Sequence, residues 1–328
     1  MTQVSEDDLI ARFFAPLAGP AALELRDDAG LLGVSAGQEL VLTKDALVAG
    51  VHFFADDPPA SIARKALRVN LSDLAAKRSR PVGFLLGLVL PAAWTTDWLQ
   101  AFAEGLGEDA ARFACPLIGG DTVSTPGPLC LSITALGEVP AAAMLRRTTA
   151  RPGDIIYCSG TIGDAALGLR LRQSTGGDWS SSLTGADRAH LLDRYLHPQP
   201  RLGLRTALLA AHAGMDVSDG LVGDLTKMMR GSGVSARLDL GRLSLSNAAK
   251  AALRIDADLL ETIATGGDDY EIIATVPPVA AKGFEGAAGR AGILVTAIGE
   301  VLDGSDPLDI VGPDGSTITF AKGSYSHY

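Results

Sequence analysis

The sequence is poor in the residues that build disulfide frameworks and zinc sites. Its 328 residues include three cysteines and five histidines. An odd number of widely spaced cysteines offers neither a disulfide framework nor a Cys-x-x-Cys metal pair. We therefore interpret Cys115, Cys130 and Cys158 as small core residues. The histidines are scattered and form no HExxH pair, which argues against a zinc hydrolase.

Basic and aromatic residues are also scarce. The 28 Lys and Arg residues are outnumbered by 38 Asp and Glu residues, which gives a formal net charge of −10, and aromatic residues make up 5% of the chain. Non-specific nucleic-acid binding needs a basic face, and single-stranded binding needs aromatic stacking platforms. We therefore expect no nucleic-acid partner. Small phosphorylated ligands are compatible with this charge if cations bridge them to the protein.

Long hydrophobic runs are missing. The longest apolar stretch, 82–94, is interrupted by Pro91 and is shorter than the roughly 20 residues that a membrane-spanning helix needs. The first eight residues lack the basic and apolar regions of a signal peptide. We expect a cytoplasmic protein with no membrane partner.

The two common nucleotide fingerprints are missing as well. The dipeptide Gly-Lys does not occur, so the chain has no Walker A loop, and no G-x-G-x-x-G motif follows a strand pattern. If the chain binds ATP, a different architecture must hold the nucleotide.

Length and composition predict two globular domains of the α/β class. A chain of 328 residues exceeds the usual size of a single core, while 47% hydrophobic and 20% charged residues are ordinary globular values. Strand and helix patterns alternate along the chain. A turn-rich segment at 147–153 suggests the boundary. We expect an N-terminal domain at 1–146 and a C-terminal α/β domain at 147–328.

Hydrophobic periodicity predicts individual elements within these domains. The first helix should begin at a capping box formed by Ser5 and Asp8. Helices are expected at 5–17, 61–76, 98–112, 164–171, 205–212 and 280–291. Strands are expected at 39–43, 82–90, 116–118, 129–139, 155–158, 236–240 and 270–276. The polar, Gly- and Ser-rich segment 173–185 is expected to be a surface loop.

Seven aspartates lie in five short patches rich in Gly, Ser or Thr. The patches are 27–28, 43–45, 70–73, 119–121 and 216–219. A carboxylate on a strand end or loop can reach a hard cation, while neighbouring Gly and Ser leave room for phosphate oxygens and water. The pattern predicts sites for Mg²⁺ and a polyphosphate.

Each of the first two patches also has an ordinary structural interpretation. Strand side chains alternate between faces, so Thr43 and Asp45 should point one way and Lys44 the other. Two oxygen ligands on one face suit Mg²⁺, but a solvated strand end would look the same. Asn70 and Asp73 crowd one turn of an apolar helix, where polar groups need partners. They could bind metal or cap a bend.

The later patches are equally ambiguous when taken singly. The glycines of 119–121 permit close approach of the backbone to a ligand, although an ordinary turn would also explain them. Asp216 and Ser218 should share one side, with Asp219 starting a helix whose N-terminus favours anions. A helix N-cap by Ser218 or Asp219 is the alternative. The segment 266–271 again places acids after a Gly-Gly turn.

Taken in order, these patches resemble the thiamine-monophosphate kinase family, which belongs to the superfamily of aminoimidazole ribonucleotide synthetase and selenophosphate synthetase. The resemblance covers nearly the whole chain. Its matching segments are 27–28, 45–53, 69–76, 118–122, 216–221 and 266–271. It implies two α/β domains. The first, 1–146, would bind ATP and magnesium, and its sheet would pair with that of a second copy in a homodimer.

The resemblance also implies a role for each site residue. Several Mg²⁺ ions would be bound by Asp28, Thr43, Asp45, Asp73, Asp121, Asp216 and Asp219. ATP would contact Gly120, Asp121, Arg147 and Ser218, and thiamine monophosphate would face His52 and Asp268. From the residues alone, His52 also fits a packed core histidine, and Arg147 also fits a surface salt bridge.

The chain departs from the family pattern in four places. Lys44 stands where many relatives carry Thr, and 77–80 replaces a Met-Gly-Ala-like segment. Asp268 is shorter than the Glu often found there. The tail 320–328 only loosely resembles the aromatic tail that covers the substrate in the family.

The implied reaction is direct in-line transfer of a phosphoryl group from ATP to thiamine monophosphate, which yields thiamine diphosphate. The acceptor phosphate has a second pKa of about 6, so it is largely dianionic at neutral pH and needs no strong general base. We assign no catalytic base. Two alternatives stay open: a carboxylate- or formyl-amide-activating ligase of the same superfamily, and a non-catalytic protein that binds metal and nucleotide.

Overall fold

The computed structural model describes residues 5–27, 29–173, 177–320 and 323–324. These residues form two compact units, each with its own sheet. The first unit extends to Leu74 and includes Ser79–Met144, and the second consists of Ala75–Arg78 and the chain from Leu145 onward. The predicted α/β class with two domains is confirmed. The division of roles between 1–146 and 147–328 stays a prediction.

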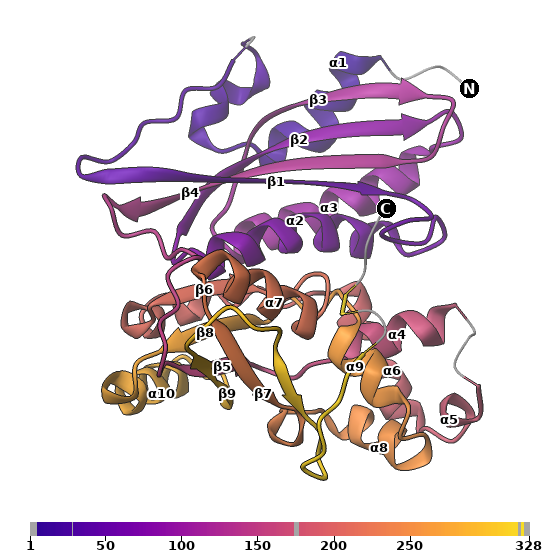
Figure 1. Cartoon of the computed structure of the whole chain (residues 1–328). Helices are drawn as coiled ribbons and strands as arrows, with labels where there is room; N and C mark the ends of the chain where they lie inside the picture. The colour runs from indigo at the N-terminus through magenta and orange to yellow at the C-terminus, as the bar shows by residue number, and fades with distance from the viewer. Residues whose placement is uncertain (1–4, 28, 174–176, 321–322, 325–328) are drawn as a thin grey trace. The chain divides into compact units, whose positions relative to one another are not determined.

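The first unit is a four-stranded sheet with two long helices along one face (Figure 1). The strand order is β1-β4-β2-β3. The strands are β1 (Gln38–Val48), β2 (Arg80–Pro91), β3 (Leu117–Thr125) and β4 (Cys130–Pro140). β4 pairs antiparallel with both β1 and β2, whereas β2 and β3 are parallel. The helices are α2 (Pro59–Ala76) and α3 (Thr96–Arg112).

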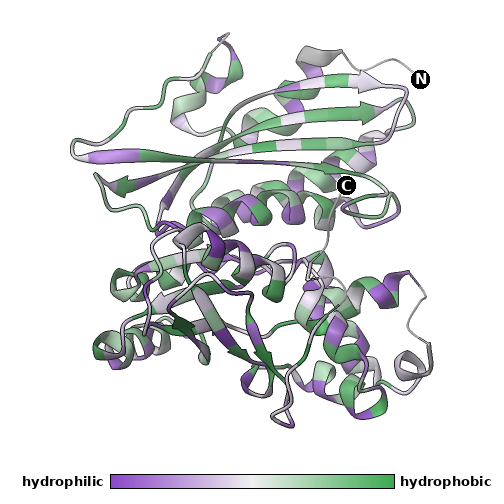
Figure 2. Cartoon of the chain, viewed as in Figure 1, coloured by the Kyte–Doolittle hydropathy of each residue, from purple (hydrophilic) through white to green (hydrophobic). Residues whose placement is uncertain are grey.

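The two faces of this sheet differ in burial. Alternate residues of the largely hydrophobic strand β2 (Figure 2), such as Leu86 and Leu88, are buried on the side of α2 and α3. On the opposite face, Leu42, Leu85 and Val123 have 64%, 41% and 45% of their surface exposed. The helices therefore cover one face, and the other presents apolar side chains.

The N-terminal segment is less regular than predicted. The amide of Asp8 donates to Ser5 Oγ over 3.2 Å, and Ser5 Oγ donates to the Asp8 carboxylate over 2.7 Å, so the predicted capping interaction is confirmed. The single helix expected over 5–17 is wrong. α1 (Glu6–Leu9) gives way to a π turn at Ile10–Phe14 and a 3₁₀ turn at Ala15–Leu17. Pro16 lacks the amide hydrogen that a continuous α-helix requires.

The second unit contains a six-stranded sheet in the order β10-β7-β9-β5-β8-β6. The strands are β5 (Ile155–Ser159), β6 (Ala213–Asp216), β7 (Ser235–Asp239), β8 (Ile272–Val276), β9 (Val295–Leu302) and β10 (Asp309–Val311). The helices are α4 (Asp164–Arg172), α5 (Gly177–Ser181), α6 (Gly185–Leu196), α7 (Leu221–Ser232), α8 (Asn247–Ile255), α9 (Leu259–Thr265) and α10 (Ala281–Arg290).

Helices cover both faces of this second sheet. Ile156 and Cys158 of β5 point into the larger core, which α4 and α6–α9 close. Tyr157 points into the smaller core, where its ring lies 4.9 Å from that of Phe284 on α10. β5 is therefore buried on both faces, as its continuous apolar sequence predicts.

Two other predicted elements are wrong. In place of the helix expected at 205–212, the chain forms two 3₁₀ turns, Leu202–Arg205 and Ala207–Ala210. The backbone is already extended at Ala211, shortly before β6 begins, so no room is left for a longer helix. The expected loop 173–185 contains α5, whose Trp179 is only 2% exposed, so this segment contributes to the core. Residues 174–176 lie outside the described residues. No helix in the described part of the chain is long and apolar enough to cross a membrane.

A buried ion pair connects the two helices of the first unit. The Arg68 guanidinium donates to both oxygens of Asp109, over 2.5 and 2.9 Å, and the two side chains are 5% and 3% exposed. A second pair between the same helices, Arg64 and Glu108, lies at the surface, with 25% and 67% exposure. The same two helices therefore carry one buried and one exposed pair.

We predict that Asp109→Ala lowers the free energy of unfolding by about 3–5 kcal/mol, because it leaves a buried guanidinium without its partner. Glu108→Ala is the matched control and should cost less than about 1 kcal/mol, since its pair is exposed to solvent. Urea denaturation of both variants measures the difference. Equal losses in the two variants would contradict the assignment of Arg68–Asp109 as the buried link.

Candidate functional site

The first unit brings Thr43, Asp45 and Asp73 together. Thr43 and Asp45 lie on the face of β1 that α2 covers, and Lys44 is exposed on the other face, as the strand alternation predicts. Thr43 Oγ1 donates to the Asp73 carboxylate on α2. The amide of Asp45 donates to Asn70 Oδ1 over 3.1 Å. β1 and one turn of α2 therefore form a single cluster of oxygen atoms.

The electrostatics of this cluster favour a cation. Burial and, to a lesser extent, the charge of Asp73 raise the pKa of Asp45 from 3.8 to about 6. Asp45 is therefore not the solvated strand end that the sequence also allowed. Asn70 has a structural role, because its side-chain amide donates to the carbonyl of Ala66 over 3.1 Å while its oxygen holds β1. The carboxylates that it positions repel one another.

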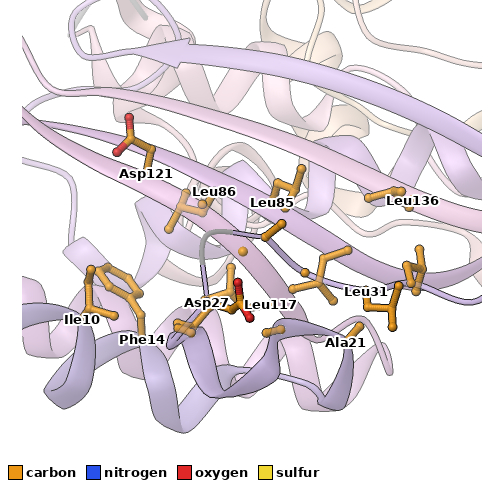
Figure 3. A pocket seen from close by; sticks show the side chains of 18 of the residues that line it. Ile10, Phe14, Ala21, Asp27, Leu31, Leu85, Leu86, Leu117, Asp121 and Leu136 are labelled. Atoms are coloured by element: carbon orange, nitrogen blue, oxygen red, sulfur yellow. The ribbon is translucent and has the colours of Figure 1, made fainter. Parts of the chain in front are cut away.

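A cavity of about 600 Å³ lies beside β3 in the same unit (Figure 3). It is bounded by the N-terminal segment, β2 and β3. Its apolar lining includes Ile10, Phe14, Leu31, Leu86 and Leu117, and its acidic lining consists of Asp27 and Asp121. This volume and lining suit a small organic ligand that carries a charged end. Asp28, a predicted metal ligand, follows Asp27 directly but lies outside the described residues.

Gly120 and Asp121 belong to strand β3 and not to a Gly-Gly-Asp turn, so that alternative is wrong. A side chain at Gly120 would lie 2.1 Å from the carbonyl oxygen of Leu86, so only glycine lets β3 approach β2 here. Asp121 is in register with Gly87, whereas Asp45 is in register, through Ile133, with Leu86. Asp121 and Asp45 therefore point to opposite faces of the sheet.

In the second unit, two loops bring together the predicted residues Asp216, Ser218, Asp219 and Asp268. Asp216 ends β6, and Ser218 and Asp219 follow it. The amide of Asp268 donates to the carbonyl of Ser218 over 2.8 Å, and the amide of Tyr270 donates to the carbonyl of Val217, also over 2.8 Å. The backbone of Asp268 is left-handed, with φ at 74°. The loop 266–270 thus runs alongside the Asp216–Asp219 segment.

Helix α7 begins later than the sequence suggested. Its first residue is Leu221, and Gly220 occupies the N-cap with no side-chain hydrogen bond. The expectation that Asp219 starts the helix is wrong, and so is the alternative that Ser218 or Asp219 caps it. Gly220 has φ at 126°, and a side chain there would lie 2.3 Å from the carbonyl oxygen of Thr265, so the sharp turn requires glycine.

Asp224, which the sequence reasoning missed, holds this turn. Its Oδ2 accepts hydrogen bonds from the amides of Ser218 and Asp219, both over 2.9 Å. These amides are therefore not available to an anionic ligand, although the sequence suggested an anion site here. Lys227 Nζ lies 2.5 Å from Asp219 Oδ2 and 2.9 Å from Asp224 Oδ1. The lysine places a positive charge between the two acids.

Two arginines, the buried Arg194 and the partly exposed Arg201, support the loop that carries Asp268. Glu271 is fully buried and accepts hydrogen bonds from Arg194 over 2.9 Å, from Arg201 Nε over 2.6 Å and from Ser159 Oγ over 2.6 Å. Burial raises the pKa of the neighbouring Asp269 carboxyl well above its usual value. The sequence signal for this network was an acid beside the apolar strand 272–276, which requires a buried partner. The positions of the arginines followed no motif.

The remaining two predicted residues occupy turns. His52 follows β1, and its Nδ1 accepts a hydrogen bond from the amide of Val48 over 3.0 Å, which fixes the ring. The side chain of Arg147 is exposed, and its carbonyl accepts from Ser232 Oγ over 3.3 Å in the second unit.

The oxygen-rich pairs fit magnesium that arrives with phosphate. Across the described residues, no three Asp, Glu, His or Cys side chains lie close enough to hold a metal ion by themselves. The acids instead come in pairs, Asp45 with Asp73 and Asp219 with Asp224. Mg²⁺ is commonly bound by one or two carboxylates together with substrate phosphates and water. The donor set therefore suits a metal–nucleotide complex better than a closed protein site.

Comparisons with known proteins cover both units. The N-terminal domain model of AIR synthase related proteins matches residues 26–139, and the C-terminal domain model matches residues 151–308. A thiamine-monophosphate kinase of Caulobacter vibrioides is 45% identical over 306 residues, which is 92% of this chain and 85% of that protein. The crystal structure of thiamine-monophosphate kinase from Stenotrophomonas maltophilia has a TM-score of 0.83 at 38% identity and covers 97% of this chain and 98% of its own. AaThiL complexed with AMPPCP and TMP has a TM-score of 0.77 at 26% identity, and the match covers 100% and 98% of the two chains.

The raised pKa of Asp45 gives a pH-dependent prediction. The folded protein holds a proton on Asp45 up to about pH 6, whereas the unfolded chain loses it near pH 3.8, so this group costs stability as pH rises through that window. Asp45→Asn removes the charge at nearly constant size. We therefore expect the metal-free variant to be more stable than the parent at pH 7.5 by about 1–3 kcal/mol.

The difference should disappear near pH 4, where Asp45 is protonated in the folded parent. Urea denaturation in EDTA at both pH values tests this prediction. A variant that is less stable than the parent at pH 7.5 would show that Asp45 is held by favourable contacts and not strained by repulsion.

Proposed function

This chain belongs to the thiamine-monophosphate kinase family, and on that premise we propose that it phosphorylates thiamine monophosphate to thiamine diphosphate with ATP. The observation that carries the proposal is that the family match extends over both units and nearly the full length of the relatives. The paired acids of each unit supply what such a reaction requires, because transfer between two phosphates gathers several negative charges.

The reaction requires positioning more than acid–base chemistry. A phosphate oxygen of thiamine monophosphate forms a bond to the terminal phosphorus of ATP as the bond to ADP breaks. The acceptor is largely dianionic at neutral pH, so no side chain needs to take its proton. The protein orients the two phosphates and compensates their charge.

We propose that magnesium is held by the acidic residues of both units. Thr43, Asp45 and Asp73 form one set, and Asp216 and Asp219 form another; Asp28 and Asp121 are further ligands. Magnesium, when bound, would neutralise the developing charge on the transferred phosphoryl group. Asn70 and Asp224 keep these carboxylates in place through their hydrogen bonds to β1 and to the Ser218–Asp219 turn.

We propose that the cavity beside β3 binds the nucleoside part of ATP. Its apolar walls exclude water from a flat heterocycle, and Gly120 and Asp121 lie at its polar side. Arg147 and Ser218 are proposed phosphate contacts, Ser218 through its hydroxyl because its amide is bound to Asp224. An exposed arginine can bind phosphate with two hydrogen bonds, which supports this role.

We propose that His52 and Asp268 face thiamine monophosphate. The ring of His52 accepts a hydrogen bond from the amide of Val48, so its orientation costs little entropy on binding, and the backbone of Asp268 is held by the carbonyl of Ser218. Asp268 lies beside the acidic turn of its unit, where a cationic or metal-bound substrate would be attracted.

We also propose that the chain forms a homodimer through the face of its first sheet opposite α2 and α3. The exposed Leu42 and Val123 lie on that face and do not line the cavity beside β3, and large exposed apolar patches commonly mark protein interfaces. A cytoplasmic location is proposed because the reaction draws on cellular ATP.

We predict that purified protein forms thiamine diphosphate from ATP and thiamine monophosphate only when Mg²⁺ is present. Chromatography of the products, with EDTA as the control, measures this. ATP consumption should require thiamine monophosphate. Nucleotide use without that acceptor would favour another superfamily activity, and binding without turnover would favour a non-catalytic protein.

We predict that Asp73→Asn and Asp219→Asn each reduce kcat/KM by at least about 100-fold, because each removes one charged ligand near the transferred phosphate. Stability in EDTA should change by less than about 1 kcal/mol, because Asp73→Asn removes a charge that repels Asp45 and Asp219→Asn weakens only a partly exposed ion pair with Lys227. Asp306→Asn, at an exposed position, is the matched control and should stay fully active. A destabilised but active Asp73 or Asp219 variant would contradict the metal assignment.

A further inference from the structure

Lys227 lies between two carboxylates of very different burial. Its ammonium is 2.5 Å from Asp219 Oδ2 and 2.9 Å from Asp224 Oδ1. Asp224 is 1% exposed, whereas the side chains of Asp219 and Lys227 are 40% and 33% exposed. One partner of the lysine is therefore fixed in the interior, and the other is accessible to ligands.

Asp224 cannot leave its position easily. It accepts hydrogen bonds from the amides of Ser218 and Asp219, and it lies one turn before Lys227 on α7. The lysine is thus anchored at Asp224 and can release Asp219 while it keeps its buried partner. Asp219 is also one of the carboxylates that we assign to magnesium.

We propose that Lys227 is a built-in counter-cation that occupies Asp219 until a divalent cation arrives together with the nucleotide. A free ion must displace the ammonium from the Asp219 carboxylate and then lie next to its positive charge. A metal–nucleotide complex brings phosphate charge that compensates both cations. Lys227 therefore disfavours binding of the free metal ion to the Asp219 carboxylate. This inference rests on the proposed function.

Binding of Mn²⁺ alone tests the inference directly, with free Mn²⁺ measured by its electron paramagnetic resonance signal in the absence of nucleotide. Exposed ion pairs of this kind contribute modestly, so Lys227→Met should bind Mn²⁺ about 1.5- to 5-fold more tightly than the parent. Lys227→Arg retains the charge and should bind Mn²⁺ like the parent. With AMPPCP present, the advantage of Lys227→Met should shrink.

Two further variants separate competition from a loss of structure. Lys227→Gln can still donate a hydrogen bond to Asp224 and should reproduce the tighter binding if Lys227→Met folds poorly. In an Asp219→Asn background, Lys227→Met should no longer change Mn²⁺ affinity, because the competition acts through Asp219. Unchanged or weaker Mn²⁺ binding by Lys227→Gln would overturn the inference, since a merely structural lysine gives that result.

The turnover assay of the parent protein distinguishes a failure of this inference from a failure of the proposed function. A parent that makes no thiamine diphosphate would refute the proposed function, while the Mn²⁺ comparison would still report whether Lys227 competes at Asp219. A parent that makes the product, with Lys227 variants that bind Mn²⁺ no more tightly, would refute the inference alone.

Discussion

Mutual repulsion between carboxylates that the fold holds close together is the constraint on which the rest of this structure depends. Each unit meets it differently. In the first, burial and, to a lesser extent, the charge of the neighbouring Asp73 raise the pKa of Asp45 to about 6. In the second, Lys227 lies between Asp219 and Asp224 and compensates both. Both arrangements are stable enough to fold, and both leave acidic oxygen atoms that a divalent cation would stabilise further.

Buried polar side chains keep these carboxylates close together. Asn70 connects α2 to β1, and Asp224 holds the turn that carries Asp219. Glu271, enclosed by Arg194 and Arg201, fixes the end of the loop in which Asp268 adopts a left-handed backbone. A buried charge is costly unless it is paired and hydrogen-bonded, so these networks form one arrangement or unfold. Within each unit, the fold thereby holds together acidic residues whose own charges would separate them.

The sequence predicted those features that depend on local periodicity. Alternation along 39–45 placed Thr43 and Asp45 opposite Lys44, and apolar spacing found α2, α3 and the two-domain α/β class. The sequence did not predict the features that depend on long-range contacts. Gly119 and Gly120 suggested close approach of the backbone to a ligand or an ordinary turn, yet they lie within β3, and Gly120 lets β3 pass close to β2. Arg194, Arg201, Asp224 and Lys227 carry no recognisable motif, because their roles arise from partners that the fold supplies.

The two acidic clusters should therefore differ in how they acquire metal. On the proposed assignment, a cation bound to the Asp45–Asp73 cluster would offset the burial and repulsion of these charges, so a free ion would be favoured once pH exceeds the pKa of Asp45 near 6. At Asp219, the lysine already supplies a positive charge, and a free ion gains less. Phosphate changes this balance, because its own negative charge accommodates both the metal and the ammonium. A single substitution that removes the charge of Lys227 would make the Asp219 cluster resemble the Asp45–Asp73 cluster. A free ion would then gain more at Asp219, even before the nucleotide arrives.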